Sequence, residues 1–154
     1  LKITDMQAAI GCAQLEKLDN IVAARRDNYK TLYEGLKDCP GIILPVAEKN
    51  SNPSWFGFLI AVKEDAGFTR NELTGYLEDN KIQTRNLFAG NLIKHPAFDE
   101  MRKTGEGYRQ VGDLKNTDFV MTNTFWIGVY PDMTAEQNAW MIECINKFCN
   151  EHTK

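Results

Sequence analysis

A short polar stretch near the middle of the chain, Asn80 to Pro96, holds the residue types that best suit a binding site. Lys81 to Arg85 is predicted to be a short strand, and the loop after it combines amide, cationic and aromatic side chains with a glycine. Binding residues are common on loops that a rigid element positions. The candidate site residues of this stretch are Arg85, Phe88, Gly90 and Asn91.

Arg85 offers the clearest chemistry. A guanidinium at the end of a strand suits a phosphate or a carboxylate, because it can donate two parallel hydrogen bonds. The alternative is an ordinary surface ion pair, and the sequence leaves both open. Lys2, just before the first predicted helix, could reach an anion at that helix start. Trp126, on a later predicted strand, could face either the core or a site.

The sequence shows no recognisable catalytic arrangement. No nucleophile–base pair and no phosphate-binding glycine loop of a known pattern stands out. His95 precedes Pro96 in a loop, but no partner that would position it as a general base is visible. We therefore assign no catalytic residue, and His152 in the C-terminal tail is expected to be inert.

The cysteines fit no zinc or iron–sulfur spacing, so we predict no metal site. We interpret them as free, buried or half-buried thiols in a reducing compartment. The four residues are Cys12, Cys39, Cys144 and Cys149.

The composition indicates one soluble domain. At 154 residues the chain matches the usual length of a single domain. Its net charge of -3 argues against nucleic acid as the main partner. Arg25–Arg26 is a tight basic pair, which we interpret as a solvated helix face. The longest apolar run, Trp55 to Val62, is too short to cross a bilayer.

Capping-box spacing marks three helix starts. In each, a Thr is followed three residues later by Gln or Glu, a pairing that satisfies two backbone donors at the start of a helix. A bend is predicted at 18–20 and a frayed tail at 150–154. The predicted helices begin at Thr4, Thr69 and Thr134, with two more at 21–36 and 117–123.

The predicted strands are 42–44, 55–62, 81–85 and 124–130. Residues 55–62 are apolar at nearly every position, so we expect this strand in the middle of the sheet with both faces covered. The short connection after 42–44 favours antiparallel pairing. The sequence therefore predicts a small α+β fold, with a mostly antiparallel sheet of three or four strands and helices packed on it.

The first predicted helix has a smooth face of small residues around Gly11. Such a face lets another helix approach closely. It fits either a partner subunit or an internal helix crossing, and the pattern does not choose between them.

The start of the chain resembles a known family. Residues 1–19 are similar to the segment that opens the small C-terminal domain of DegT/DnrJ-like sugar-nucleotide aminotransferases, where the pattern is Asn-x-Arg/Lys-x-x-x-x-Gln-Ala-Ala-x-Gly-x-x-Gln-Leu. Those enzymes have the fold type I architecture of pyridoxal phosphate (PLP) enzymes. The matching residues are Lys2, Gln7, Ala8, Ala9, Gly11, Gln14 and Leu15.

Two further motifs narrow the resemblance. TRNLFAGNL at 84–92 and NTFWIGVYP at 123–131 look like the 3-dehydrase branch of the family, which includes CDP-4-keto-6-deoxyglucose 3-dehydrases and related GDP-sugar enzymes. Ordinary aminotransferases of the family carry a His-Tyr pair where Leu87–Phe88 stands here. The resemblance extends over essentially the whole chain.

The resemblance implies that residues 1–154 are the C-terminal domain of a longer enzyme. A large domain preceding Leu1 would hold pyridoxal or pyridoxamine phosphate, the catalytic histidine and, in one sub-branch, an iron–sulfur cluster served by a reductase. The whole enzyme would remove the C3 hydroxyl of a nucleotide-linked 4-keto-6-deoxyhexose in deoxysugar biosynthesis of the lipopolysaccharide or O-antigen type. We expect it to be cytoplasmic, and this chain to be inactive alone.

The resemblance also implies roles for the candidate residues. Arg85, Phe88, Gly90, Asn91 and Trp126 would form a wall of the substrate pocket. Lys2 would lie near the coenzyme phosphate of the neighbouring subunit of a homodimer joined through the first helix.

Two other functions stay open. The first is an ordinary PLP-dependent sugar-nucleotide aminotransferase, which Leu87–Phe88 disfavours. The second is a stand-alone, non-enzymatic α+β binding module.

Overall fold

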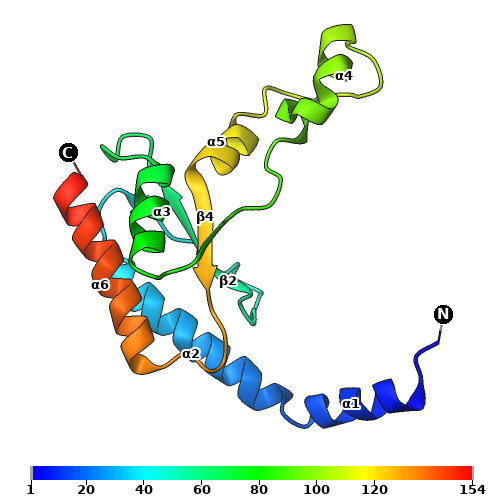
Figure 1. Cartoon of the computed structure of the whole chain (residues 1–154), viewed down its shortest axis with the longest axis vertical. Coiled ribbons are helices and arrows are strands. Elements are labelled where there is room, and N and C mark those ends of the chain that lie inside the picture. The colour runs from blue at the N-terminus through cyan, green and yellow to red at the C-terminus, as the bar shows by residue number, and fades with distance from the viewer. Residues whose placement is uncertain (1, 154) are drawn as a thin grey trace.

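The computed structural model describes residues 2–153, and within them a four-stranded sheet is flanked by helices (Figure 1). The strand order is β1-β2-β4-β3, and every neighbouring pair is antiparallel. The predicted α+β class with an antiparallel sheet is therefore confirmed. The strands are β1 (Ile42–Ile43), β2 (Gly57–Val62), β3 (Thr84–Asn86) and β4 (Thr124–Gly128).

The three predicted capping boxes are all present. In each, the Thr hydroxyl accepts a hydrogen bond from the backbone three residues later, and the Gln or Glu side chain accepts one from the Thr backbone. The α-helices are α1 (Asp5–Leu15), α2 (Leu18–Leu36), α3 (Arg70–Asp79), α4 (Asp99–Thr104), α5 (Lys115–Asn123) and α6 (Ala135–His152), with 3-10 turns at Leu92–Lys94 and Pro96–Phe98.

Several predicted boundaries were wrong, and three of them have a cause in the structure. The helix break lies at 16–17, and the residues predicted to bend, 18–20, begin α2. The C-terminal helix continues to His152, because the His152 ring stacks on Phe148 at a centroid distance of 4.1 Å and so holds the last turn in place. The strand predicted at 81–85 begins only at Thr84. Lys81 has a φ of 65°, so it belongs to the turn that follows α3 and not to the strand.

The core lies between one face of the sheet and helices α2, α3 and α6. Inward-facing residues of β2 and β4 contribute to it, together with the apolar stripe of each helix. The fully buried members with the largest side chains are Phe58, Phe125, Leu32, Leu36, Ile60, Leu73, Leu77, Ile127 and Ile145.

The opposite face of the sheet is open within the described chain. Burial alternates along β2, so Phe58, Ile60 and Val62 are buried while Leu59 and Ala61 stay half-buried. The prediction that both faces of this strand are covered was wrong for residues 2–153, although β2 does lie inside the sheet. Every helix of the core packs on the same face of the sheet. The other face is therefore available to contact a ligand or another domain.

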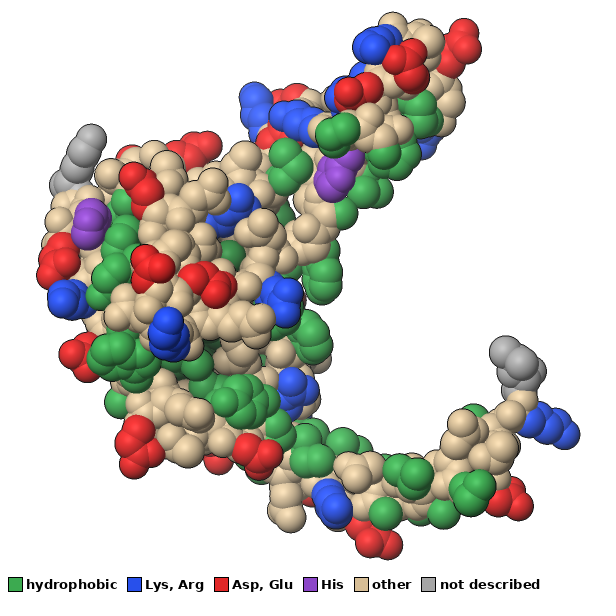
Figure 2. Space-filling model, in the orientation of Figure 1, with side chains coloured by type: hydrophobic (Ala, Val, Ile, Leu, Met, Phe, Trp, Pro, Cys, Tyr) green, Lys and Arg blue, Asp and Glu red, His purple; other side chains and the backbone are tan. Residues whose placement is uncertain are grey.

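Two segments extend away from the body (Figure 1). One is α1, in which no described residue is buried and whose apolar side chains line the arm (Figure 2). A Cβ at Gly11 would meet nothing within 4 Å, so an internal crossing at this glycine is excluded for the described chain. The second segment contains α4. Contact of α1 with a partner subunit stays a prediction.

The Arg25–Arg26 pair is not a solvated face, so that interpretation was wrong. Arg25 donates to the Val129 carbonyl oxygen at 3.0 Å and to that of Phe56 at 3.5 Å. Arg26 donates to the carbonyl oxygen of Asn52 at 2.7 Å. Arg25 therefore attaches mainly the segment after β4 to α2, and Arg26 attaches the loop before β2.

The thiol prediction holds for three cysteines and fails for one. Cys39, Cys144 and Cys149 are free and buried, whereas Cys12 is free and exposed on α1. No helix within residues 2–153 combines the length and apolar character needed to cross a bilayer.

Candidate functional site

Three hollows surround β3 and the loop that follows it, and neighbouring hollows share side chains. The loop cavity, about 600 Å³, shares Leu87 and Phe88 with the aromatic groove, about 180 Å³. The aromatic groove shares Trp126 with the cationic cavity, about 400 Å³. The candidate surface is therefore continuous from the loop to the far end of β3.

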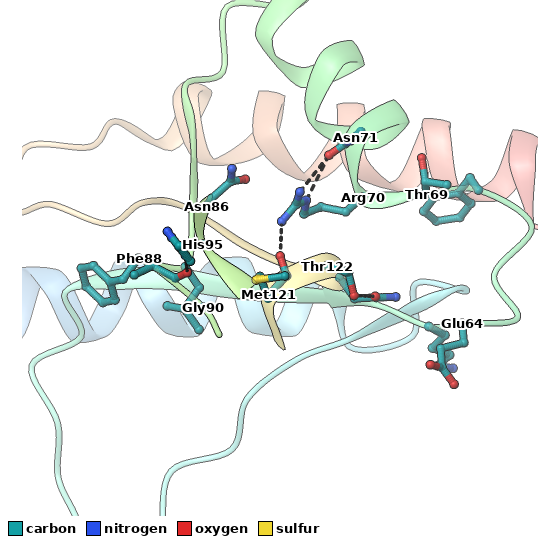
Figure 3. Close-up of a pocket in the computed structure, with 15 residues that line it drawn as sticks. Glu64, Thr69, Arg70, Asn71, Asn86, Phe88, Gly90, His95, Met121 and Thr122 are labelled. Atoms are coloured by element: carbon teal, nitrogen blue, oxygen red, sulfur yellow. Dashed lines mark hydrogen bonds between the residues drawn. The ribbon is translucent and has the colours of Figure 1, made fainter. Parts of the chain in front are cut away.

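The loop cavity lies between the start of α3, the end of α5 and residues 86–90 (Figure 3). Arg70, the first residue of α3, extends into it and donates to the Met121 carbonyl oxygen at 2.7 Å. Its other nitrogens donate to the Asn71 side chain at 3.0 and 3.2 Å. Partial burial lowers the pKa of the Arg70 guanidinium. Arg70 is thus committed mainly to holding α3 against α5.

Gly90 sits where only glycine fits without strain. Its φ is +63°, and an added Cβ would lie 2.6 Å from the Met121 Cβ and 3.1 Å from the Met121 Cα. Close approach of the loop backbone to α5 therefore requires the missing side chain. The predicted involvement of Gly90 in the site has a structural basis in this contact.

Asn91 is buried beneath the loop rather than displayed on it. The side chain is 4% exposed, and its amide nitrogen donates to the Asp118 carboxylate at 2.8 Å. Its side-chain oxygen accepts from the Ile93 backbone at 3.2 Å. His95 supports the same loop by a hydrogen bond between its Nε2 and the Ala89 carbonyl oxygen. Contact of Asn91 with a substrate stays a prediction, and in this structure the side chain positions the loop.

Phe88 presents the most exposed aromatic ring of the loop. It is 78% exposed, and its φ of 46° places the backbone in the left-handed region, which is uncommon outside glycine. Its ring stands at the edge of the loop cavity (Figure 3) and also borders the aromatic groove. An exposed aromatic held in an unusual backbone conformation is a candidate contact for a ligand.

The aromatic groove lies on the open face of the sheet. Trp126 pairs with Leu59 across β2 and β4, and the Phe56 ring lies 5.1 Å from the Trp126 ring at an angle of 55°. Leu87 and Phe88 close the groove from the loop. This apolar hollow suits a flat or weakly polar part of a ligand.

The cationic cavity lies at the edge strand β3. Arg85 pairs with Trp126 across β3 and β4, and Lys81 approaches from the turn after α3. The lining residues include no Asp or Glu. Glu78 lies close by, where hydrogen bonds from the Thr84 backbone at 2.6 Å and the Thr84 hydroxyl at 2.8 Å lower the pKa of its carboxyl group.

Four predicted site residues thus meet on one surface: Arg85, Phe88, Gly90 and Trp126. Lys2 does not join them, because it precedes α1 and lines none of the three hollows. Its predicted place beside a neighbouring subunit stays untested. Among residues 2–153, no cluster of His, Cys, Asp and Glu could hold a metal ion.

Sequence reasoning missed Phe56 and Lys81, and it gave Arg70 no role. Phe56 was assigned to the strand alone, although a glycine beside it, Gly57, marks a close approach: a Cβ there would lie 2.6 Å from the Trp126 ring. Lys81 could not be predicted from its neighbours, because its position depends on a left-handed backbone that a lysine rarely adopts.

The fold agrees with comparisons with known proteins. A family model described as the DegT/DnrJ/EryC1/StrS aminotransferase family matches residues 1–146. The chain belongs to this family. The resemblance stated from the sequence motifs is thereby confirmed.

Relatives in the DegT/DnrJ/EryC1/StrS family include nucleotide-sugar dehydratases. The dTDP-4-dehydro-2,6-dideoxy-D-glucose 3-dehydratase of Saccharopolyspora spinosa is 47% identical over 96% of this chain and 31% of its own length. The lipopolysaccharide biosynthesis protein RfbH of Salmonella typhimurium is 48% identical over 96% of this chain and 33% of its own length. The chain therefore spans about a third of the curated relatives that it matches.

Solved structures of DegT-family enzymes with PLP fold type I architecture share this fold. A GDP-4-keto-6-deoxymannose-3-dehydratase with bound GDP-perosamine matches at a TM-score of 0.78 and 26% identity, over 91% of this chain and 35% of that one. The Escherichia coli GDP-4-keto-6-deoxy-D-mannose-3-dehydratase with bound hydrated PLP matches at 0.76 and 25%, over 91% and 34%. The predicted fold class is confirmed.

Proposed function

We propose that this chain is the small C-terminal domain of a PLP- or pyridoxamine phosphate-dependent nucleotide-sugar 3-dehydratase. The whole enzyme would remove the C3 hydroxyl of a nucleotide-linked 4-keto-6-deoxyhexose during deoxysugar biosynthesis. The observation that carries the proposal is the contrast in similarity. The chain is 47% identical to a 3-dehydratase of Saccharopolyspora spinosa but 27% identical to a dTDP-4-amino-4,6-dideoxy-D-glucose transaminase of Shigella dysenteriae.

In this proposal the chain contributes one wall of the substrate pocket. Arg85, Phe88 and Trp126 are available for contact because the sheet face that carries them is open. Gly90 and Asn91 do not contact the substrate in this proposal. They position the loop by holding it against α5. The proposal assigns the catalytic group to residues outside 1–154.

The described residues do not form a coenzyme site by themselves. A PLP phosphate needs several free donors converging on one point, and in the loop cavity the Arg70 guanidinium already donates to Met121 and Asn71. We therefore derive no chemical step through the coenzyme from this chain. The proposal assigns most of the coenzyme contacts, and any iron–sulfur cluster, to residues outside 1–154.

The proposal extends to assembly. The exposed apolar arm α1, with Met6 79% and Ile10 65% exposed, would pack in a homodimer, and Lys2 at its start would approach the coenzyme phosphate of the other subunit. A reductase would be a further partner in the cluster-containing sub-branch. A cytoplasmic location completes the proposal and fits the three buried free thiols.

The decisive experiment uses the full-length protein. The protein is loaded with PLP, reduced with borohydride and weighed intact by mass spectrometry. We expect bound coenzyme without a covalent adduct, because a 3-dehydratase of this branch lacks the Schiff-base lysine. A covalent adduct would favour the aminotransferase alternative. Absence of any bound coenzyme would favour a non-enzymatic binding module and contradict the proposal.

A further inference from the structure

We propose that the cationic cavity at the edge strand β3 binds the diphosphate of the nucleotide-sugar substrate, with Lys81 and Arg85 as its anion-binding residues. This inference deepens the proposed function and rests on it for the identity of the ligand. The cavity itself, about 400 Å³, is a feature of this chain.

The two cations are available for a ligand. Within residues 2–153, neither the Lys81 ammonium nor the Arg85 guanidinium has a hydrogen-bond or ion-pair partner. Arg25, Arg26 and Arg70 instead donate to backbone carbonyl oxygens. Lys81 and Arg85 thus differ from these arginines of the body, whose hydrogen bonds have a structural role.

The walls of the cavity favour an anion. Besides the two cations, the lining includes Trp126, Gly128 and Tyr130, and no carboxylate. The nearby Glu78 carboxylate accepts two hydrogen bonds from Thr84, and these lower its pKa more than the charge of Arg85 does. The two exposed cations repel each other at close range, and a bound dianion would remove that repulsion.

The backbone holds the two cations in place. Lys81 has a φ of 65°, so the turn after α3 directs the chain sharply into β3. Arg85 is fixed by the pairing of β3 with β4, in which it lies opposite Trp126. The backbone of both residues is thus fixed before a ligand binds, so binding has to order only their side chains.

The adjoining aromatic groove favours a diphosphate over a simple carboxylate. Trp126 borders both hollows, so a ligand in the cationic cavity can continue into the apolar groove beside Phe56. A nucleotide sugar has this form, with a doubly charged centre and less polar groups on either side. A small amino acid such as glutamate carries a carboxylate but no part that would occupy the groove.

The test is isothermal titration of the full-length protein with its coenzyme bound. The probes are dTDP, GDP, CDP, inorganic diphosphate and glutamate. The variants are Arg85→Gln and Lys81→Asn, the second chosen because Asn tolerates a positive φ. Arg85→Lys tests rescue of the charge, and Arg109→Gln, at an exposed arginine, is the matched control. The visible spectrum of the bound coenzyme reports whether each variant is intact.

We expect Arg85→Gln and Lys81→Asn each to weaken the best-binding nucleoside diphosphate by about tenfold to hundredfold, as loss of a charged hydrogen bond predicts. Inorganic diphosphate should weaken in parallel, while glutamate binding and the coenzyme spectrum stay unchanged. Arg85→Lys should recover part of the affinity, and Arg109→Gln should match the parent protein.

Three results would overturn the inference. They are failure of the parent protein to bind any nucleoside diphosphate, unchanged binding in both variants, or loss confined to glutamate, which would identify a carboxylate site. The proposed function fails separately, if the borohydride experiment finds a lysine adduct or no coenzyme. A nucleotide-sugar aminotransferase could still bind its diphosphate at Lys81 and Arg85, so the two failures are distinguishable.

Discussion

The side-chain amide of Asn91 donates to the Asp118 carboxylate at 2.8 Å, and this bond attaches the loop of the candidate site to α5. Lys94 pairs with the other oxygen of Asp118 at 2.7 Å. The loop that presents Phe88 is therefore held by a small polar network, and its two ends are fixed by β3 and the turn at Leu92–Lys94.

Replacing Asn91 by Ala should destabilise the chain. Asp118 and the Ile93 backbone N–H would lose their buried partner, which costs about 1–3 kcal/mol in the free energy of unfolding. Urea unfolding monitored by fluorescence measures the change. Asn116→Ala, at an exposed site on α5, is the control and should stay within about 0.5 kcal/mol of the parent.

The same network predicts a pH dependence. Hydrogen bonds from Lys94 and then Asn91 lower the pKa of Asp118 below its ordinary value. A carboxyl group with a lowered folded-state pKa stabilises the fold above its unfolded pKa of about 4, and the stabilisation is lost as pH falls through the folded value. The difference in unfolding free energy between the parent and Asp118→Asn should therefore shrink below about pH 4. A constant difference from pH 7 to pH 3 would contradict this.

Gly90→Ala should cost more than Gly105→Ala. Both glycines have a positive φ, 63° and 73°. An alanine in this left-handed backbone is strained, which destabilises each variant by about 1 kcal/mol. Only at Gly90 would the new Cβ collide with Met121, whereas at Gly105 nothing lies within 4 Å. Steric overlap adds about 1–3 kcal/mol. Paired urea unfolding curves measure both, and equal losses would show that the loop moves freely away from α5.

Arg25→Ala should loosen the segment after β4, which the Arg25 side chain attaches to α2. The Val129 carbonyl oxygen would lose a hydrogen bond of 3.0 Å from a cation, and bonds of this kind contribute about 1.5–3 kcal/mol. Thermal unfolding measures the loss of stability. Lys30→Ala, at an exposed position of the same helix, should have little effect. A loss no larger than that of the control would mean that the Arg25 contacts contribute nothing to stability.

Phe88→Ala should affect activity without affecting stability. The ring is 78% exposed and packs little in the described chain, so unfolding of the chain should change by less than about 0.5 kcal/mol. In the full-length protein we expect kcat/KM to fall by about tenfold to hundredfold, because a buried aromatic contributes about 1.5–3 kcal/mol to a complex. Val111→Ala, 72% exposed, is the control. Unchanged kcat/KM would remove Phe88 from the substrate pocket.

Local sequence features predicted much of the fold. The capping boxes at Thr4, Thr69 and Thr134 placed three helix starts correctly, because their hydrogen bonds join residues only three positions apart. The strands after Pro53 and Asn123 were also found, although their ends shifted by one or two residues. Their apolar runs were sufficient to mark them as strands inside a sheet.

Within the candidate site, residue type identified Arg85, Phe88 and Trp126, but not the hollows they share. Asn91 was predicted as a contact residue, and its burial beneath the loop depends on Asp118, 27 positions away. Arg25 was interpreted as solvated, and its acceptor is 104 positions away. Such partners are not visible in a local pattern.

The sequence by itself determined three helix starts, the antiparallel α+β class and the family, since all of these depend on short patterns along the chain. Only the tertiary structure decided which face of the sheet stays open and which cations remain without partners. The physical reason is that burial of Leu59 or pairing of Arg85 depends on what packs across the sheet. In this chain every core helix packs on the face opposite to them.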